Sequence, residues 1–141
     1  MRMAIFGLIL IKSKRMDKNK FIPGDIVKCD NEICKVLEIG TSEWYDGDYT
    51  CKLRYPSHNI FTALQNELDG VALTTEILDK NGWEHLHDVY FKDYPQRKLV
   101  VSDGEACIIN ESCSLFLCKA EYVHQLQHLL FSLGINHEME V

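Results

Sequence analysis

The sequence predicts an α+β protein in which a β-rich first half precedes a half made of helix, sheet and helix. Three observations support this fold class. Tight-turn dipeptides separate short apolar runs in the first half, a capped helical segment follows, and a helical apolar stripe lies near the end of the sequence. The composition of the 141 residues, 46% hydrophobic and 26% charged, suits one globular domain or two very small ones.

The first predicted strands reverse in tight turns. Pro23–Gly24 predicts a turn before a strand at residues 25–29, and Asp30–Asn31 predicts a two-residue hairpin loop after it. A second strand starts near Glu32. Its alternation predicts one buried face, and a glycine near its end predicts a bend or bulge. The residues expected on that face are Ile33, Leu37 and Ile39, with the bend at Gly40.

A second hairpin is predicted around Asp46–Gly47. In the strand after it, Cys51, Leu53 and Tyr55 are expected to face inward, and the residues between them outward. The outward residues are Thr50, Lys52 and Arg54.

The segment from residue 57 to residue 73 is expected to return the chain, with a helical turn at 62–67 and a last short strand at 71–73. Short strands, a bent second strand and tight hairpins over residues 21–73 together predict an SH3-like small β barrel or an open meander of strands.

The second half, residues 74–141, is predicted as α-β-β-β-β-α, an antiparallel sheet with helices packed on one side, docked on the barrel. Thr74 is a typical helix N-cap residue, and Gly82 is a typical residue to end the helix. Four strand-like runs follow, HDVYF, QRKLVVS, GEACIIN and CSLFLC, with Asp103–Gly104 as a hairpin loop. Residues 120–133 predict a helix whose buried stripe is Val123, Leu126, Leu130 and Leu133.

Charge is unevenly distributed along the chain. The formal net charge is −6, yet residues 1–20 hold six Lys or Arg and one acidic residue. The remainder holds nine basic and twenty acidic side chains. A body this acidic repels a phosphate backbone, so non-specific nucleic-acid binding is disfavoured.

The first twenty residues leave several interpretations open. Residues 4–11 form an apolar run between basic residues, too short for a bilayer span, which needs about 20 residues. They are interpreted as a disordered or mis-annotated extension, with Met16 as the alternative start of translation. An ordered extra element and a membrane-targeting segment are the other interpretations.

The six cysteines show neither a CxxC pair nor the spacing of a zinc ribbon. Cys29 and Cys34 flank the first predicted turn, and the later ones lie in strand-like runs. This pattern favours small buried side chains in a reducing compartment, so the cytoplasm is the expected location.

Two histidines, His124 and His128, are spaced four apart on the last predicted helix, which is a spacing that can bind zinc. The metalloprotease pattern also needs a glutamate after the first histidine, and Gln125 stands there instead. His137 follows beyond the helix stop. No metal site and no cofactor are therefore predicted, and the histidine face is expected to be partly exposed or in contact with the barrel.

Catalytic signatures are weak. The sequence contains no GxSxG elbow, P-loop or GxGxxG pattern, and no local context pairs a cysteine with a histidine. The polar cluster Glu84, His85, His87 and Asp88 is interpreted as a solvated loop. No catalytic residue is predicted, and a non-enzymatic protein is favoured. Six residues are candidates for ligand binding: Trp44, Tyr45, Lys52, Arg54, His124 and His128.

The stretches GDIVKC, LTTEILDKNGW and YVHQLQHLLFSLG carry a resemblance. In this order they resemble a group of small uncharacterised proteins from gut Bacteroides-type bacteria and their phages, over about residues 21–137. Trp83 stands where that group usually has the aromatic residue of its helix motif. The resemblance implies a cytosolic protein linked to phages or mobile elements, without a defined chemistry.

Three functions remain open from the sequence. The first is a binding or adaptor protein of phage or mobile-element origin that acts on a host protein or a small ligand. The second is a sponge that sequesters a nucleotide messenger against host immunity, and it needs basic side chains to converge. The third is an SH3-like nucleic-acid-binding module with Lys28, Lys35, Lys52 and Arg54 on its outer face. The oligomeric state is not predicted.

Overall fold

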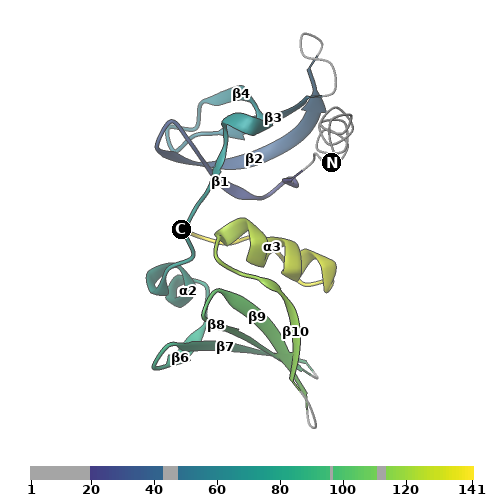
Figure 1. The fold of residues 1–141 in the computed structure, drawn as a ribbon. Coiled ribbons are helices and arrows are strands. Elements are labelled where there is room, and N and C mark those ends of the chain that lie inside the picture. Colours follow the sequence, from purple (N-terminus) through teal and green to yellow (C-terminus); the bar gives the residue numbers. More distant parts are fainter. Residues whose placement is uncertain (1–19, 43–47, 96, 111–113) are drawn as a thin grey trace, which may run out of the picture. The chain divides into compact units, whose positions relative to one another are not determined.

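Two units make up the chain, Met1–Asp69 and Gly70–Val141. The structure is a computed structural model that describes residues 20–42, 48–95, 97–110 and 114–141 (Figure 1). It is mostly β, with two five-stranded antiparallel sheets and a C-terminal helix. The boundary expected between Leu73 and Thr74 falls inside the second unit. No helix in the described residues is long and apolar enough to cross a membrane.

The sheet of the first unit has the strand order β4-β3-β2-β1-β5, so the last strand returns to pair with the first. A 3-10 turn, η1, connects β4 to β5. The elements are β1 (Ile26–Cys29), β2 (Glu32–Thr41), β3 (Tyr49–Arg54), β4 (Ile60–Leu64), η1 (Gln65–Glu67) and β5 (Asp69–Gly70).

The loop between β1 and β2 determines which side chains of the first sheet are buried. Asp30 and Asn31 both take the left-handed backbone, with φ of 51° and 65°, as a two-residue hairpin loop of this type requires. The predicted turn is thereby confirmed. It places Val27 opposite Cys34. Because opposed residues project from the same face of a sheet, both side chains enter the core.

The predicted inner face of β2 is wrong over its first half. Cys34 and Val36 are buried, whereas Ile33 is 38% exposed. A register shift between Val36 and Glu38 then marks a bulge, which was expected at Gly40 instead. The bulge inverts the alternation, so Ile39 packs against the core as predicted although it lies three positions beyond Val36.

Strand β3 has the predicted alternation. Cys51 and Leu53 are fully buried, and Lys52 and Arg54 are exposed. Asp46 and Gly47, the predicted hairpin loop before this strand, lie outside the described residues. The buried core of the first unit consists of Phe21, Val27, Cys29, Cys34, Val36, Cys51, Leu53 and Leu68.

The return segment differs in detail from its prediction. The helical turn expected at 62–67 is the shorter η1, whose start is capped by the Glu67 carboxylate accepting the Leu64 N–H at 2.8 Å. Leu68 then enters the core, and the final strand follows at once as β5 rather than at 71–73. The expected strand is reduced to a single bridge between Ala72 and Tyr122.

The sheet of the second unit has the order β10-β9-β8-β7-β6, a simple meander. One helix precedes it and another follows it (Figure 1). The elements are α2 (Thr75–Lys80), β6 (Glu84–Leu86), β7 (Val89–Tyr94), β8 (Arg97–Ser102), β9 (Glu105–Ile109), β10 (Ser114–Lys119) and α3 (Val123–Ser132).

This sheet has five strands where the sequence predicted four. Residues 84–86, interpreted as the start of a solvated loop, form β6 and pair with β7. The buried Trp83 anchors its beginning, and a left-handed residue, His87 with φ of 58°, permits the tight reversal between Leu86 and Val89. The predicted Asp103–Gly104 hairpin is confirmed, with positive φ at both residues.

Helix α2 starts and stops at the residues that the sequence predicted. The Thr74 hydroxyl accepts the Ile77 N–H at 3.3 Å, which makes Thr74 the N-cap. Gly82 follows the helix with φ of +83°, the backbone that glycine adopts without strain. Ile77 and Leu78 are its buried residues, as expected.

Helix α3 starts at Val123, three residues later than predicted, because the Gln125 side chain caps it by accepting the Tyr122 N–H at 3.1 Å. Val123, Leu126 and Leu130 of the predicted stripe are buried, and Leu133 is partly buried. The core of the second unit is formed by Leu78, Trp83, Leu99, Val101, Ala106, Ala120, Leu126, Leu129 and Leu130.

The segment after α3 is held against the second unit by two amide side chains. Asn81 donates to the Glu140 carbonyl at 2.8 Å and accepts the Glu140 N–H at 2.9 Å. Gln127, fully buried on α3, donates to the His137 carbonyl at 2.9 Å. Ile135 and Met139 of the same segment pack against the core. The segment is therefore a fixed part of the second unit.

We predict that Leu126→Ala destabilises the second unit by about 2–5 kcal/mol, because it removes a fully buried side chain and leaves a cavity. Leu86→Ala is the matched control: the same change at a leucine that is 66% exposed should stay within about 0.5 kcal/mol. Denaturant unfolding followed by tryptophan fluorescence in a Trp44→Phe background, where Trp83 in the same core is the remaining tryptophan, measures both. Equal losses in the two variants would contradict the assignment of this core.

A second prediction concerns the two hydrogen bonds by which the Asn81 side chain holds the final segment at Glu140. Asn81→Ala removes both hydrogen bonds to Glu140 and should cost about 1–3 kcal/mol. Amide exchange at Glu140 should then accelerate strongly. The Glu138 amide is the internal control, because its acceptor is the Asn136 side chain. Unchanged exchange at Glu140 would show that Asn81 does not hold this segment.

Candidate functional site

The six residues predicted to bind a ligand fall in the first unit, in the second unit and outside the described residues. Trp44 and Tyr45 lie outside the described residues. Lys52 and Arg54 are exposed on β3 of the first unit, and the Lys52 ammonium lies 2.7 Å from the Glu38 carboxylate. The remaining two, both histidines, are on α3 of the second unit.

The histidines of α3 form a short aromatic row. The rings of His124 and His128 are 5.6 Å apart and nearly perpendicular, and Tyr122 stacks on His124 at 5.9 Å. The third histidine, His137, contacts the ring of Phe131 at 5.1 Å. Among the described residues, no group of three His, Cys, Asp or Glu side chains is placed to hold a metal ion.

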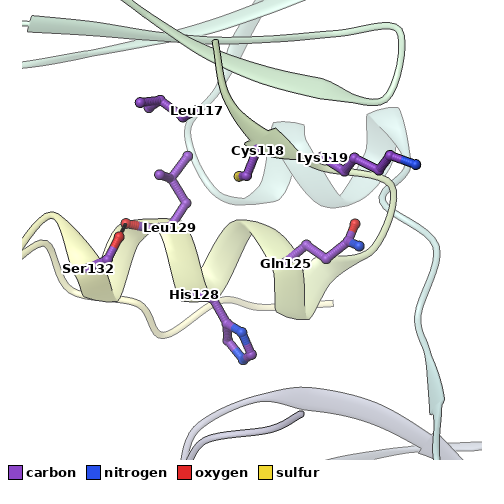
Figure 2. A pocket seen from close by; sticks show the side chains of 7 residues that line it. All are labelled: Leu117, Cys118, Lys119, Gln125, His128, Leu129 and Ser132. Carbon is purple, nitrogen blue, oxygen red and sulfur yellow. Dashed lines mark hydrogen bonds between the residues drawn. The ribbon is translucent and has the colours of Figure 1, made fainter. Parts of the chain in front are cut away.

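A cavity of about 450 Å³ lies between α3 and β10. Figure 2 shows Leu129 and Gln125 pointing from the helix toward the strand, whereas Lys119 and His128 extend away from the Cys118 thiol. We call it the α3–β10 cavity. Its lining residues are Leu117, Cys118, Lys119, Gln125, His128, Leu129 and Ser132.

Two polar side chains of the α3–β10 cavity, Gln125 and Ser132, form hydrogen bonds within the fold. The side-chain Oε1 of Gln125 accepts the N–H groups of Glu121 and Tyr122 at 2.7 and 3.1 Å, and the Ser132 hydroxyl donates to the Leu129 backbone carbonyl at 2.8 Å. Burial, together with the nearby Cys107, raises the pKa of the Cys118 thiol. A neutral thiol is a poor nucleophile, so this shift disfavours Cys118 as a nucleophile.

The cysteines of the first unit are also protected. Cys29, Cys34 and Cys51 are free thiols buried in the core. Burial is the main cause that raises the pKa of Cys34 and of Cys51 to about 11. These three thiols therefore contribute apolar packing, in agreement with the prediction from their spacing.

A second hollow, of about 500 Å³, lies on the first unit. We call it the Tyr55–Phe61 cleft. Three parts of the first sheet line it: the β1–β2 turn, the β3–β4 connection with β4 itself, and η1. Its lining residues are Cys29, Asp30, Glu32, Tyr55, Ser57, Asn59, Phe61, Thr62, Ala63 and Glu67.

Two aromatic rings form one wall of the Tyr55–Phe61 cleft. The β3–β4 connection turns through His58, whose φ is 71°, and the Tyr55 N–H donates to the Asn59 carbonyl at 2.9 Å. This reversal brings the Tyr55 and Phe61 rings edge to face at 5.3 Å. Phe61 lies opposite the buried Leu53, so it belongs to the inner face of the sheet, yet it is 56% exposed. The cleft thus extends the core to the surface.

Three residues with carboxylate side chains line the same cleft. Asp30 and Glu32 come from the β1–β2 turn, and Glu67 comes from η1; all three residues are exposed. None of the ten described residues that line the cleft is Lys, Arg or His. An aromatic wall with carboxylates and without a cation attracts positively charged ligands.

The electrostatics of the cleft are consistent with this. A hydrogen bond with the Cys29 side chain, followed by burial and the negative charge of groups such as Asp30, raises the pKa of Tyr55. Tyr55 therefore remains a neutral phenol at physiological pH, and its ring keeps the electron-rich face that favours cations.

Sequence reasoning did not find this site. It used Asp30 only as a turn residue and expected Tyr55 to face inward, without locating the strand that supplies Phe61. The signal that points to the cleft is the pair Ile60 and Phe61, two adjacent large apolar side chains directly after a polar turn. The register of β3 with β4 is needed to show that the Tyr55 and Phe61 rings meet, and that they do so beside the β1–β2 turn.

Comparison with known proteins finds no matching family, no similar curated protein and no similar solved structure.

We predict that Cys34 and Cys51 resist alkylation in the folded protein at pH 8. Their pKa of about 11 leaves them protonated, whereas an unfolded thiol, with a pKa near ~8.5, reacts readily. Because folding raises both values, their contribution to stability is present below the unfolded pKa and is lost as the pH rises toward 11. Peptide mapping after iodoacetamide treatment, with and without denaturant, measures this. Equal labelling in both states would contradict the burial of these thiols.

Proposed function

We propose that this protein is a non-enzymatic binding or adaptor protein whose first unit is an SH3-like barrel that holds a cationic segment of a partner protein in the Tyr55–Phe61 cleft. The order β4-β3-β2-β1-β5, with η1 between β4 and β5, supports the barrel. Five strands with tight connections and a return of the last strand to the first are typical of such barrels.

The observation on which the proposal rests is the composition of the Tyr55–Phe61 cleft. Asp30, Glu32 and Glu67 line this cleft together with two aromatic rings, and no lining residue compensates their charge. A lysine or arginine side chain suits this combination, because its stem packs on the rings while its charged end reaches the carboxylates. The strongly acidic remainder of the chain favours the approach of a basic partner.

The nucleotide-sponge hypothesis has less support. It requires several cations to converge on one phosphate-binding pocket. The Lys52 and Lys98 ammonium groups lie 2.7 and 3.7 Å from carboxylates, and Lys92 donates to the Asn81 carbonyl at 2.7 Å. The six cations that would have to converge are divided equally between the two units: Lys35, Lys52, Arg54, Lys92, Arg97 and Lys98.

One observation favours the nucleic-acid-binding hypothesis as a second candidate. The register sets Lys35 directly opposite Arg54, and Lys52 lies two residues before Arg54 on the same strand face. These side chains share the outer face of the first sheet. A gel-shift assay at low salt tests it: a complex that Arg54→Glu abolishes supports it, and the absence of any complex excludes it.

Location and origin remain part of the proposal. Free buried thiols support a reducing compartment such as the cytoplasm. The resemblance to proteins of gut bacteria and their phages suggests a phage or mobile-element origin, and hence a host protein as the partner.

The binding proposal predicts that capped peptides with a central lysine, arginine or trimethyllysine bind, and that the same peptide with glutamate does not. Phe61→Ala should weaken binding about tenfold, since a desolvated cation–π contact contributes up to about 2 kcal/mol. Phe116→Ala is the matched control, because it makes the same change at a phenylalanine that is 53% exposed on β10 of the second unit, outside the cleft. Isothermal titration calorimetry gives both affinities.

Charge provides the second arm of this test. Glu32→Gln should weaken binding of the lysine peptide, whereas Asp69→Asn, which changes an exposed carboxylate outside the cleft, should not. Rising salt should weaken binding to the unmodified protein. Equal affinity for the lysine and glutamate peptides, or no binding of any cationic peptide, would rule the proposal out.

A further inference from the structure

We propose that the partner segment binds as an added β-strand along the open edge of β4, with basic side chains at every second position entering the Tyr55–Phe61 cleft. This inference rests on the proposed function and deepens it, because it specifies the conformation and the sequence pattern of the partner.

Strand β4 ends the first sheet. Its only strand neighbour in the described residues is β3. Ile60 and Phe61, on opposite faces of this strand, are 51% and 56% exposed. Edge strands with exposed apolar side chains are templates for pairing with another chain, and natural proteins use them for peptide recognition.

The phase of the hydrogen bonds in this hairpin shows which backbone groups face the open edge. The Tyr55 N–H donates to the Asn59 carbonyl at 2.9 Å, so these two residues form a hydrogen-bonded pair. Such pairs alternate along an antiparallel ladder. Leu53 with Phe61 and Cys51 with Ala63 are then hydrogen-bonded as well.

The residues between them direct their backbone groups away from β3. These residues are Ile60, Thr62 and Leu64. An independent observation supports this phase: the Leu64 N–H, which should point outward, is accepted by the Glu67 carboxylate at 2.8 Å. The fold itself thus closes the edge at Leu64 and leaves the edge at Ile60 and Thr62 for an incoming strand.

The side-chain pattern of the partner follows from the two faces of β4. Positions of the added strand on the Phe61 face lie over the Tyr55–Phe61 cleft, where Asp30 and Glu32 attract a cation. Positions on the opposite face lie beside Ile60 and near Arg54, its cross-strand partner, which favours apolar and disfavours basic side chains. The expected ligand alternates basic and β-branched residues, unlike a continuous basic tail.

A second copy of this chain is a poorer occupant of the same edge. Its β4 has the sequence IFTAL, which supplies no cation. Pairing of two β4 edges would bring the carboxylates of both clefts near one another, and like charges oppose such pairing. Charge complementarity therefore favours a basic partner strand.

The test uses the full-length protein and a capped heptapeptide, Thr-Val-Lys-Val-Lys-Val-Thr. Two N-methylated versions carry the methyl groups on the valine or on the lysine backbone nitrogens. A paired strand directs only alternate N–H groups to its neighbour. Relative to the unmodified heptapeptide, one of the two N-methylated peptides should therefore bind at least tenfold more weakly, and the other less than twofold more weakly. A heptapeptide of the same composition with adjacent lysines should bind more weakly than the alternating one.

Amide exchange locates the pairing on the protein. Peptide binding should slow exchange at Ile60 and Thr62 at least tenfold, while Phe61 and Ala63, already bonded to β3, change little. Equal binding of both N-methylated peptides together with sensitivity to Phe61→Ala would overturn strand addition and leave the cation cleft intact. Absence of binding by any of these peptides would overturn both. Protection of Ile60 and Thr62 without peptide, together with a concentration-dependent dimer in sedimentation, would replace the partner with a second copy and also overturn the inference.

Discussion

The left-handed backbone of Asp30 and Asn31 is the constraint on which the first unit depends. This two-residue loop sets Val27 opposite Cys34 and thereby decides which face of β2 forms the core. The same loop projects Asp30 and Glu32 beside the aromatic pair. One local conformation therefore fixes both the packing of the five-stranded sheet and the charge of its cleft. A one-residue change in this register would exchange buried and exposed side chains along the strand.

The β4 edge and the cleft beside it are stabilised by the same few groups. The Glu67 carboxylate caps η1 and at the same time closes the open edge of β4 at Leu64. The aromatic wall of the cleft is continuous with the core of the first unit, since Tyr55 packs against the buried residues of that core. The cleft is thus built on strands and on the short turns between them rather than on a long loop, which restricts the positions of its side chains. In the second unit, by contrast, the side chains of Gln125 and Asn81 form hydrogen bonds within the fold: Gln125 caps α3, and Asn81 accepts the Glu140 N–H.

Much of the secondary structure could be predicted because its signals are local. Thr74 and Gly82 delimit α2, and Asp103–Gly104 forms the hairpin loop between β8 and β9. These caps and turns could be predicted because each depends on one or two residues and their near neighbours. The bulge at Leu37 could not be predicted, because a register shift depends on the opposing strand. Strand β6 was missed because its exposed side chains lack the alternation of a buried strand. The cleft was missed for a related reason: Asp30 and Phe61 are far apart in sequence, and the pairing of β2 with β3 and of β3 with β4 brings their segments together.

Mapping of a bound cation on the isotopically labelled protein by NMR tests the central claim most directly. Titration with the acetylated, amidated single residue trimethyllysine isolates the cleft from any pairing along β4. We expect shift changes centred on Asp30, Glu32, Tyr55, Phe61 and Glu67, with saturation at increasing ligand and loss of the response in Phe61→Ala. Changes centred on the α3–β10 cavity, or no saturable change in the cleft, would contradict the assignment of the Tyr55–Phe61 cleft as a cation-binding site.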